Sequence, residues 1–173
     1  MERQCRAHAK PIPSQREAGQ IWQGIGFLTA DKHFLAPLTE IKEVLTVSHI
    51  TPLPAAAPWF LGVSNLRGQV LPVTDLEAFL FGRQHRLKDS SRILVVDFEK
   101  TGVGFLVQQV VGVQRFLNKT MKTMIEDEMT EEVKAHLQGE FVNELSRWYV
   151  LSLKNLSQTG QFYHVVKEQG LKL

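Results

Sequence analysis

The sequence predicts a mainly β protein whose strands form barrels or a sandwich and are connected by short helices. Two observations carry this prediction. Segments rich in β-branched and aromatic residues recur about every 8 to 12 residues and are separated by turn residues. No long amphipathic helix alternates with them, so nothing indicates a βαβ unit. No internal sequence repeat is evident by eye.

The predicted strands are short segments in which apolar, β-branched and aromatic residues dominate. Order should begin near Ile21. The first half of the chain carries five such segments, at residues 23–28, 33–38, 46–51, 62–66 and 69–75. The second half also carries five, at residues 92–98, 103–107, 110–116, 139–142 and 147–153. The pair 92–98 and 103–107 is a hairpin by its spacing alone, because only a short turn separates the two segments.

The expected helices are short. Residues 39–45 could begin as a helix, because Ile41, Val44 and Leu45 would share one face, and residues 78–83 should form a helical turn before a polar loop. Residues 126–137 are acidic at the start and mildly amphipathic, which predicts a helix that Thr130 could cap. Residues 154–165 should form a closing helix or an extended tail.

Gly68 and Pro72 restrict the backbone, so their positions predict a tight turn and a sheet edge or bulge. Gly68, with Arg67, forms the tight turn between residues 62–66 and 69–75, and glycine suits this turn because it adopts positive φ without penalty. Pro72 lies within the second of these strands and cannot donate to a ladder, so it should lie at a sheet edge or a bulge.

Composition restricts the location and the partners. Residues 1–19 are polar and lack periodicity, which predicts a flexible N-terminal tail, and residues 20–173 should form the folded domain. The formal net charge of +2 offers no polycationic face, so nucleic acid is not an expected partner. A single cysteine, Cys5, excludes an internal disulfide and fits a reducing compartment. The N-terminus lacks a secretory apolar run and no later stretch is long enough to span a bilayer, so we expect a cytoplasmic protein without direct membrane insertion.

The search for catalytic and ligand motifs predicts no catalytic residue, no metal site and no cofactor. The chain has no G-x-x-x-x-G-K-[ST] loop for phosphate, and its two G-x-G pairs do not continue to a third glycine. Ser64 stands in a sequence that begins like a nucleophile elbow, but Leu66 occupies the place of the second glycine, so Ser64 is interpreted as a strand residue. The six histidines lack metal-ligand spacing. A small hydrolase or nucleotide-binding enzyme is therefore the less favoured alternative.

One stretch has a composition typical of protein–protein contact sites. Asn65, Arg67 and Gly68 surround a tight turn beside an apolar strand, and Trp59 and Phe60 lie close by in the sequence. An arginine among aromatic and aliphatic groups is common in interface hot spots. Composition alone favours a solvated turn arginine and core aromatics instead.

A longer motif favours the protein–protein contact site over a solvated turn arginine. Residues 62–76, with the sequence GVSNLRGQVLPVTDL, resemble the signature of the CheW family, G-V-x-N-L-R-G-x-[IV]-[LIV]-P-[VI]-x-D-L. Residues 41–44 resemble the family's V-x-E-[IV] segment, and residues 93–98, 104–107 and 110–113 resemble its later strands, so the resemblance covers about residues 21–162. The similarity is strongest to the PilI-type branch that serves type IV pilus twitching motility, on residues 34–38 and the acidic stretch around Glu126. Departures from the pattern are Thr74 and the pair Gln108-Gln109.

The resemblance implies a fold and a function. The fold would be two intertwined five-stranded SH3-like β-barrels with short helices, packed around a shared apolar core. The function would be a non-enzymatic adaptor that couples the cytoplasmic tip of a chemoreceptor, a methyl-accepting protein, to the regulatory domain of a CheA-type histidine kinase. A coupling protein of flagellar chemotaxis is the alternative. A CheV-like fragment is less favoured, because no receiver domain follows Leu173.

The resemblance also implies which residues meet each partner. On the kinase side it places Ile41, Glu43 and Arg67. The residues expected to shape that edge are Gly62, Val63 and Asn65. Asp75 should organise a turn by hydrogen bonding. A groove between the barrels would receive the chemoreceptor. The residues expected there are Val70, Leu71, Val103 and Phe105.

Overall fold

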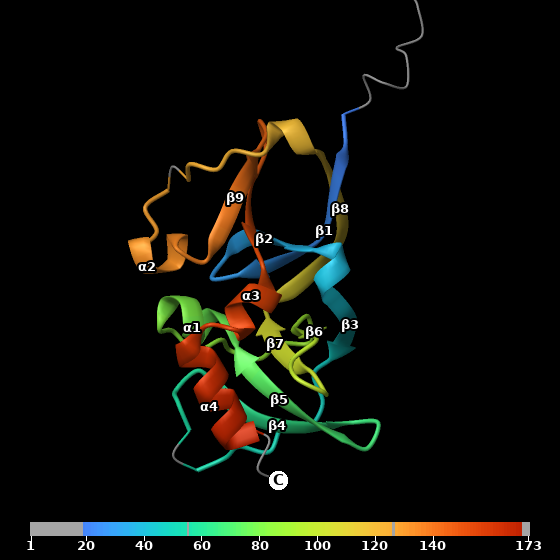
Figure 1. Ribbon diagram of the computed structural model, residues 1–173, viewed down its shortest axis with the longest axis vertical. Coiled ribbons are helices and arrows are strands. Elements are labelled where there is room, and N and C mark those ends of the chain that lie inside the picture. The colour runs from blue at the N-terminus through green and yellow to red at the C-terminus, as the bar shows by residue number, and fades with distance from the viewer. Residues whose placement is uncertain (1–18, 55, 126, 171–173) are drawn as a thin grey trace, which may run out of the picture.

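The computed structural model describes residues 19–54, 56–125 and 127–170, and Figure 1 shows two curled β-sheets stacked end to end, with short helices at their junction and along one side. The predicted tail, residues 1–19, lies outside the described residues except for Gly19. Within the described residues, no helix is both long and apolar enough to cross a membrane.

The first barrel is a five-stranded sheet in the order β8-β1-β2-β10-β9. Its pairs are antiparallel except for β10, which runs parallel to β2. The five strands, in chain order, are β1 (Ile21–Thr29), β2 (Lys32–Pro37), β8 (Gln109–Leu117), β9 (Leu137–Val142) and β10 (Arg147–Leu151).

The second barrel has the order β3-β6-β7-β5-β4, again with a single parallel pair, β5 with β7. Its strands are β3 (Ile41–Thr46), β4 (Phe60–Leu66), β5 (Gln69–Asp75), β6 (Arg92–Val96) and β7 (Val103–Val107). The chain leaves the first barrel after β2, builds the whole second barrel and then returns, so the two barrels are intertwined as predicted.

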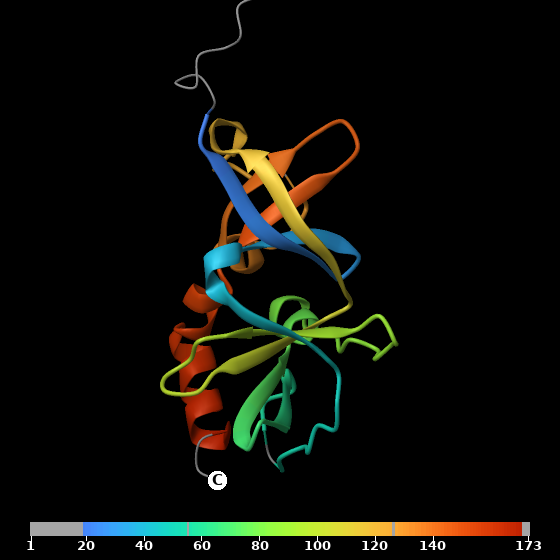
Figure 2. The same ribbon diagram turned by 90° about the vertical axis from the view of Figure 1, so that its right-hand side faces the viewer.

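Most of the short helices lie at the junction of the barrels or along one side of the second barrel, and one 3₁₀ turn lies at the far end of the first barrel (Figures 1 and 2). Two are single 3₁₀ turns and four are α-helical. In chain order they are η1 (Leu38–Glu40), α1 (Leu76–Phe81), η2 (Asn118–Thr120), α2 (Glu131–Lys134), α3 (Leu153–Ser157) and α4 (Gly160–Gly170).

One apolar cluster joins the two barrels. Phe27 and Phe34 from the first barrel share it with Phe105 from the second and with Phe162 from α4. Phe162 is buried and stacks on the Phe105 ring, with 5.2 Å between the ring centroids. Each barrel also has its own smaller interior cluster, around Phe141 in the first and around Ile93 in the second. The shared apolar core that the family resemblance implied is therefore present.

Alternation along β6 explains why its sequence is a continuous apolar run. Leu94 and Val96 point into the shared cluster, whereas Ile93 and Val95 point into the interior of the second barrel. Successive side chains on a strand face opposite sides, so a strand with both faces buried carries no polar alternation.

Four local predictions need correction. The strand expected over residues 46–51 is wrong beyond Thr46, where β3 ends, and Thr51 makes only an isolated bridge with Val63. The helix expected over residues 126–137 is present only as α2, although Thr130 does cap it by accepting a hydrogen bond from Val133 N at 3.4 Å. The helix expected over residues 39–45 is wrong beyond η1, because residues from Ile41 onward pair with β6. Pro72 lies in a strand that has neighbours on both sides, yet its parallel pairing with β7 begins only at Val73. Pro72 therefore occupies a position where no ladder donor is needed on the β7 side.

Candidate functional site

The β4–β5 hairpin ends in a two-residue turn made by Arg67 and Gly68. Both have positive φ, 51° and 80° respectively, as the type I′ turns that match the twist of a hairpin require. Asn65 stabilises the turn, since its Oδ1 accepts a hydrogen bond from Gly68 N at 2.8 Å. Positive φ is easy for glycine but uncommon for arginine, so the chain keeps a strained residue at the tip of this hairpin.

The Arg67 side chain reaches across to the edge strand β3. Its two terminal nitrogens donate to the two carboxylate oxygens of Glu43, Nη1 to Oε2 at 3.0 Å and Nη2 to Oε1 at 2.5 Å. This fork is the bidentate geometry that guanidinium and carboxylate groups favour. The hydrogen bond to Glu43 and its negative charge raise the pKa of Arg67. The Arg67 side chain remains 74% exposed, so the pair presents its polar groups to solvent.

A small pocket of about 90 Å³ lies beside this ion pair. Glu43 and Arg67 form its polar rim, and Leu66, Val70 and Leu71 are among its apolar lining residues. Val70 pairs with Asn65 across the hairpin, so it belongs to the edge that carries Arg67.

The other residues expected at the kinase edge have structural roles. A Cβ at Gly62, where φ is 135°, would lie 2.0 Å from the carbonyl oxygen of Thr51, so only glycine fits there. Val63 forms two backbone hydrogen bonds with Thr51, at 2.8 and 2.9 Å, which hold the segment before β4 against the hairpin. Ile41 is half buried and packs against the shared core. The structure thus brings Glu43, Asn65, Arg67 and Val70 together and uses the remaining residues as support.

Three of the four residues expected in the receptor groove are core residues. Val103 and Phe105 are fully buried in the shared cluster, and Leu71 is buried in the interior of the second barrel. Val103 and Phe105 therefore offer no surface to a partner in this conformation, and Leu71 contributes only to the wall of the small pocket beside Arg67. Val70 alone of the four is partly exposed.

A different set of apolar residues is exposed, and sequence reasoning missed it. The edge strand β8 exposes large apolar side chains at alternating positions, and its pairing with β1 adds Ile21, which is opposite Leu117. The exposed residues are Ile21, Val111, Val113 and Leu117. The sequence of residues 109–117, QVVGVQRFL, does not alternate between polar and apolar residues, so it carries no signal of which side chains face outward.

A buried polar cluster behind α1 has the residue types of a catalytic triad. Ser91 Oγ lies 2.9 Å from His85 Nε2, and His85 Nδ1 lies 3.6 Å from Glu77 Oε2. The His85 side chain is 3% exposed and Ser91 is 1% exposed, so no substrate can reach the hydroxyl. Asp75 belongs to the same cluster: it caps α1 through Ala78 N at 3.1 Å and accepts from His85 N at 2.7 Å. Asp75 therefore organises a turn, and burial raises the pKa of its carboxyl.

The serine of the apparent nucleophile elbow is also structural. Ser64 Oγ is 3.1 Å from Ser48 Oγ and donates to the backbone carbonyl of His49 at 3.0 Å. Among the described residues, no three histidine, cysteine or acidic side chains are placed to hold a metal ion.

Comparison with known proteins agrees with this geometry. The family profile for the CheW-like domain matches residues 23–160. Protein PilI of Pseudomonas aeruginosa is 34% identical over 165 residues, which cover 95% of this chain and 92% of PilI. The chemotaxis protein CheW of Thermotoga maritima is 35% identical over 95 residues, which cover 54% of this chain and 62% of that CheW.

A solved structure shares the fold. The scaffolding protein TtCheW from Thermoanaerobacter tengcongensis superposes with a TM-score of 0.69 at 21% identity, over 89% of this chain and 94% of TtCheW. The two intertwined barrels, the hairpin motif and the family match therefore lead to one conclusion: the chain belongs to the CheW-like domain family.

Proposed function

We propose that the protein is a non-enzymatic adaptor that couples the cytoplasmic tip of a chemoreceptor to the regulatory domain of a CheA-type histidine kinase. The observation that carries the kinase half is the Arg67–Glu43 pair, which a strained turn holds at the exposed end of the β4–β5 hairpin. Strain of this kind persists at sites where function requires the residue. The family signature lies over the same turn, and among the described residues no three histidine, cysteine or acidic side chains are placed to hold a metal ion there.

The receptor half rests on exposed apolar surface. Because Leu71, Val103 and Phe105 are buried, we infer that a helical receptor tip packs on the outward side of β8 and β1 instead. Figure 2 looks onto β8, with β3 below it at the junction of the barrels, and Val44 of β3 is also exposed. Rows of exposed aliphatic residues are typical of surfaces that receive an amphipathic helix.

The signalling pathway that the protein serves is inferred from the share of the chain that each relative matches. The similarity to PilI spans 95% of the chain, whereas the similarity to the CheW of Thermotoga maritima spans 54%. This difference supports service in type IV pilus twitching motility, in the cytoplasm, over the alternative of flagellar chemotaxis. Deleting the gene should abolish twitching and leave swimming unchanged, and the reverse phenotype would favour the flagellar alternative.

The kinase contact is tested by titration against the regulatory domain of the cognate kinase. Arg67→Glu and Glu43→Arg should each weaken binding on the order of 30-fold, because a hot-spot arginine is removed or left without its partner. Arg115→Glu is the matched control, since Arg115 is exposed on the first barrel, and this variant should bind the kinase like the wild type.

The doubly substituted chain tests whether Arg67 contacts the kinase directly or only helps to shape the edge that binds it. Arg67→Glu combined with Glu43→Arg restores an ion pair within the protein but not the original side chain at the tip, so binding should stay weak. Restored binding would mean that the pair only shapes the edge. Arg67→Gly relieves the positive φ, so it should keep or slightly raise the melting temperature while binding is lost. Unchanged affinity in both charge-reversal variants would exclude this edge as the kinase site.

A further inference from the structure

The loop between α1 and β6 carries a basic tip with one exposed leucine. Arg86, Leu87 and Lys88 follow one another there, and the Leu87 side chain is 56% exposed. Within the described part of the chain, neither Arg86 nor Lys88 forms an ion pair. In Figure 2 this loop projects from the second barrel on the side opposite α4, away from the body of the molecule.

Buried polar groups hold the base of this loop. The His85 ring is enclosed between Glu77 and Ser91, and its backbone nitrogen donates to Asp75. Ser91 Oγ also accepts from Lys88 N at 3.0 Å, and Ser91 N donates to Lys88 O at 2.9 Å. The two ends of the tip are therefore fastened to each other and to the helix before it.

Two further arginines flank the tip and are themselves held. Arg83 Nε donates to the buried carboxylate of Glu77 at 2.7 Å while its side chain stays 62% exposed. Arg92 Nη1 donates to the carbonyl oxygens of Asp89 and Ser91, at 2.7 and 2.8 Å. Four positively charged side chains thus lie within residues 83–92, and Asp89 is the acidic residue of that segment.

Several buried polar groups hold the tip in one conformation, which indicates that the tip has a function. Burying a carboxylate, an imidazole and a hydroxyl is unfavourable unless their hydrogen bonds are satisfied. Apart from the cap of α1 by Asp75 and the bond that Glu77 Oε2 accepts from Ala30 N at 3.4 Å, the bonds of this cluster fix a solvent-exposed loop. A loop that is fixed before binding loses less entropy when a partner docks. Unpaired cations beside an exposed leucine match a partner that offers carboxylates and an apolar side chain.

We propose that the Arg86-Leu87-Lys88 tip is a docking site for an acidic segment of a partner protein that also carries apolar side chains. This site is distinct from the Arg67–Glu43 edge and does not depend on the function assigned to that edge. A protein segment is favoured over nucleic acid because the whole chain has a net charge of only +2 and the tip presents an aliphatic side chain in place of a stacking ring.

The probe is a short fluorescein-labelled peptide of glutamates with interspersed leucines, titrated into the full chain and followed by anisotropy. Arg86→Glu with Lys88→Glu should weaken binding at least about 10-fold. The matched control, Lys119→Glu with Lys122→Glu, makes the same change of net charge at exposed positions of the first barrel and should leave binding within about 2-fold.

Two neutral substitutions test the role of shape. Leu87→Ala should weaken binding about 3-fold through lost apolar contact. Ser91→Ala keeps every charge but frees the loop, and it should also weaken binding about 3-fold, with a melting curve to confirm that the protein is folded. If Ser91→Ala unfolds the chain, Leu87→Ala alone decides the question of shape.

Equal losses in the basic-tip variant and its control would overturn the proposal, because binding would then follow net charge alone. Absence of saturable binding to the wild-type chain would overturn it as well. A single-stranded oligonucleotide that binds more tightly than the peptide, and loses affinity in the same variant, would assign the tip to nucleic acid instead.

Discussion

The two barrels follow the same strand plan, but their equivalent hairpins end in different ways. Each sheet contains one parallel pair, β2 with β10 and β7 with β5, and the order of strands around it is the same. The β4–β5 hairpin of the second barrel therefore corresponds to the β9–β10 hairpin of the first. This repeat is invisible in the sequence, because the same topology is filled with different side chains.

The difference lies at the tips. Arg67 at the β4–β5 tip is tied to Glu43 of a neighbouring strand, so the tip is oriented by long-range contact. At the β9–β10 tip Asn143 Oδ1 accepts from Leu145 N and Ser146 N, at 3.0 and 2.7 Å, and Leu145 is left 97% exposed. Both tips have a local hydrogen bond to an asparagine Oδ1, and only the β4–β5 tip is also held by an ion pair to a distant strand. The comparison teaches that the same hairpin holds an exposed charged side chain in one orientation where the opposite edge of the sheet supplies its ion-pair partner.

The largest expected effect tests whether the two barrels are one folding unit. Phe105→Ala, in the second barrel, removes a fully buried ring from the shared cluster and should cost about 3–5 kcal/mol. Because the cluster joins both barrels, the fluorescence of Trp22 and Trp148 in the first barrel should melt together with the circular dichroism signal. The measurement uses a Trp59→Phe background, so that only these two tryptophans report. A first barrel that still melts at the wild-type temperature would show that the cores are independent.

A smaller effect compares the two helices that follow the equivalent strands β5 and β10. Asp75 caps α1 and also accepts from His85 N, whereas Ser152 caps α3 by accepting from Asn155 N at 3.1 Å. Asp75→Ala leaves two backbone donors without acceptors and should cost about 2–3 kcal/mol. Ser152→Ala also removes the hydrogen bond that its hydroxyl donates to Glu40 Oε1 at 2.7 Å, so it should cost about 1–2 kcal/mol. Urea unfolding measures both, and equal losses would show that the bond from His85 N to Asp75 stabilises the fold no more than the bond from Ser152 to Glu40 does.

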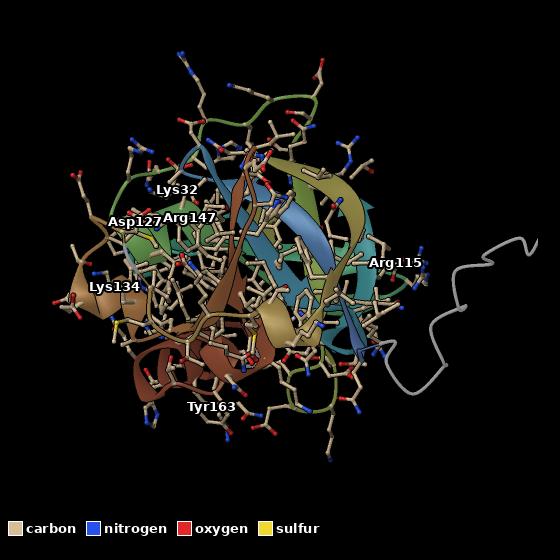
Figure 3. All side chains as sticks on the ribbon, turned by 90° about the horizontal axis from the view of Figure 1, so that it is seen from above. Lys32, Arg115, Asp127, Lys134, Arg147 and Tyr163 are labelled. Atoms are coloured by element: carbon tan, nitrogen blue, oxygen red, sulfur yellow. The ribbon has the colours of Figure 1, made fainter. Side chains whose placement is uncertain are left out.

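The smallest effect concerns an acidic anchor of the first barrel. Asp127 accepts from Tyr149 Oη and from Lys32 Nζ, the latter at 3.3 Å, and Figure 3 shows Lys32 and Asp127 gathered on one side of the molecule. Burial alone would raise the pKa of Asp127, but the hydrogen bonds from Tyr149 and Lys32 outweigh it and lower the pKa. Asp127→Asn should therefore cost about 1–2 kcal/mol at neutral pH.

The pH dependence of this anchor follows from the sign of the shift. A carboxyl whose pKa is lowered in the folded state stabilises the fold above its unfolded pKa, about 3.9, and loses that contribution as the pH falls through the folded value. The difference in unfolding free energy between the wild type and Asp127→Asn should thus shrink below about pH 4. Asp75 should respond in the opposite direction, because burial raises its pKa. A difference for Asp127→Asn that does not change with pH would mean that its charge is unimportant.

Much of the β architecture could be predicted from local sequence. The apolar run of β6, its hairpin with β7, the turn at Gly68 and the cap at Thr130 depend on residues close together in the chain. The helix expected from residue 126 failed because Asp127, which would have favoured a helix start, is instead bound by Lys32 and Tyr149 from distant strands. Local propensity for a helix is weak, and such long-range bonds override it.

The sequence by itself determined the family motif, most of the strands and the turn that carries Arg67, because backbone preferences and apolar periodicity act over a few residues. Only the tertiary structure decided which side chains are exposed. Val103 and Phe105 are as apolar as the exposed Val111 and Val113, yet the parallel pairing of β5 with β7 places the first two inside the shared core. Glu43 and Arg67, 24 residues apart, meet because β3 and β4 lie at the two edges of one sheet that curls into a barrel. A strand pattern of period 2 distinguishes the two faces of a strand, and the packing of the second barrel against the first decides which face is buried.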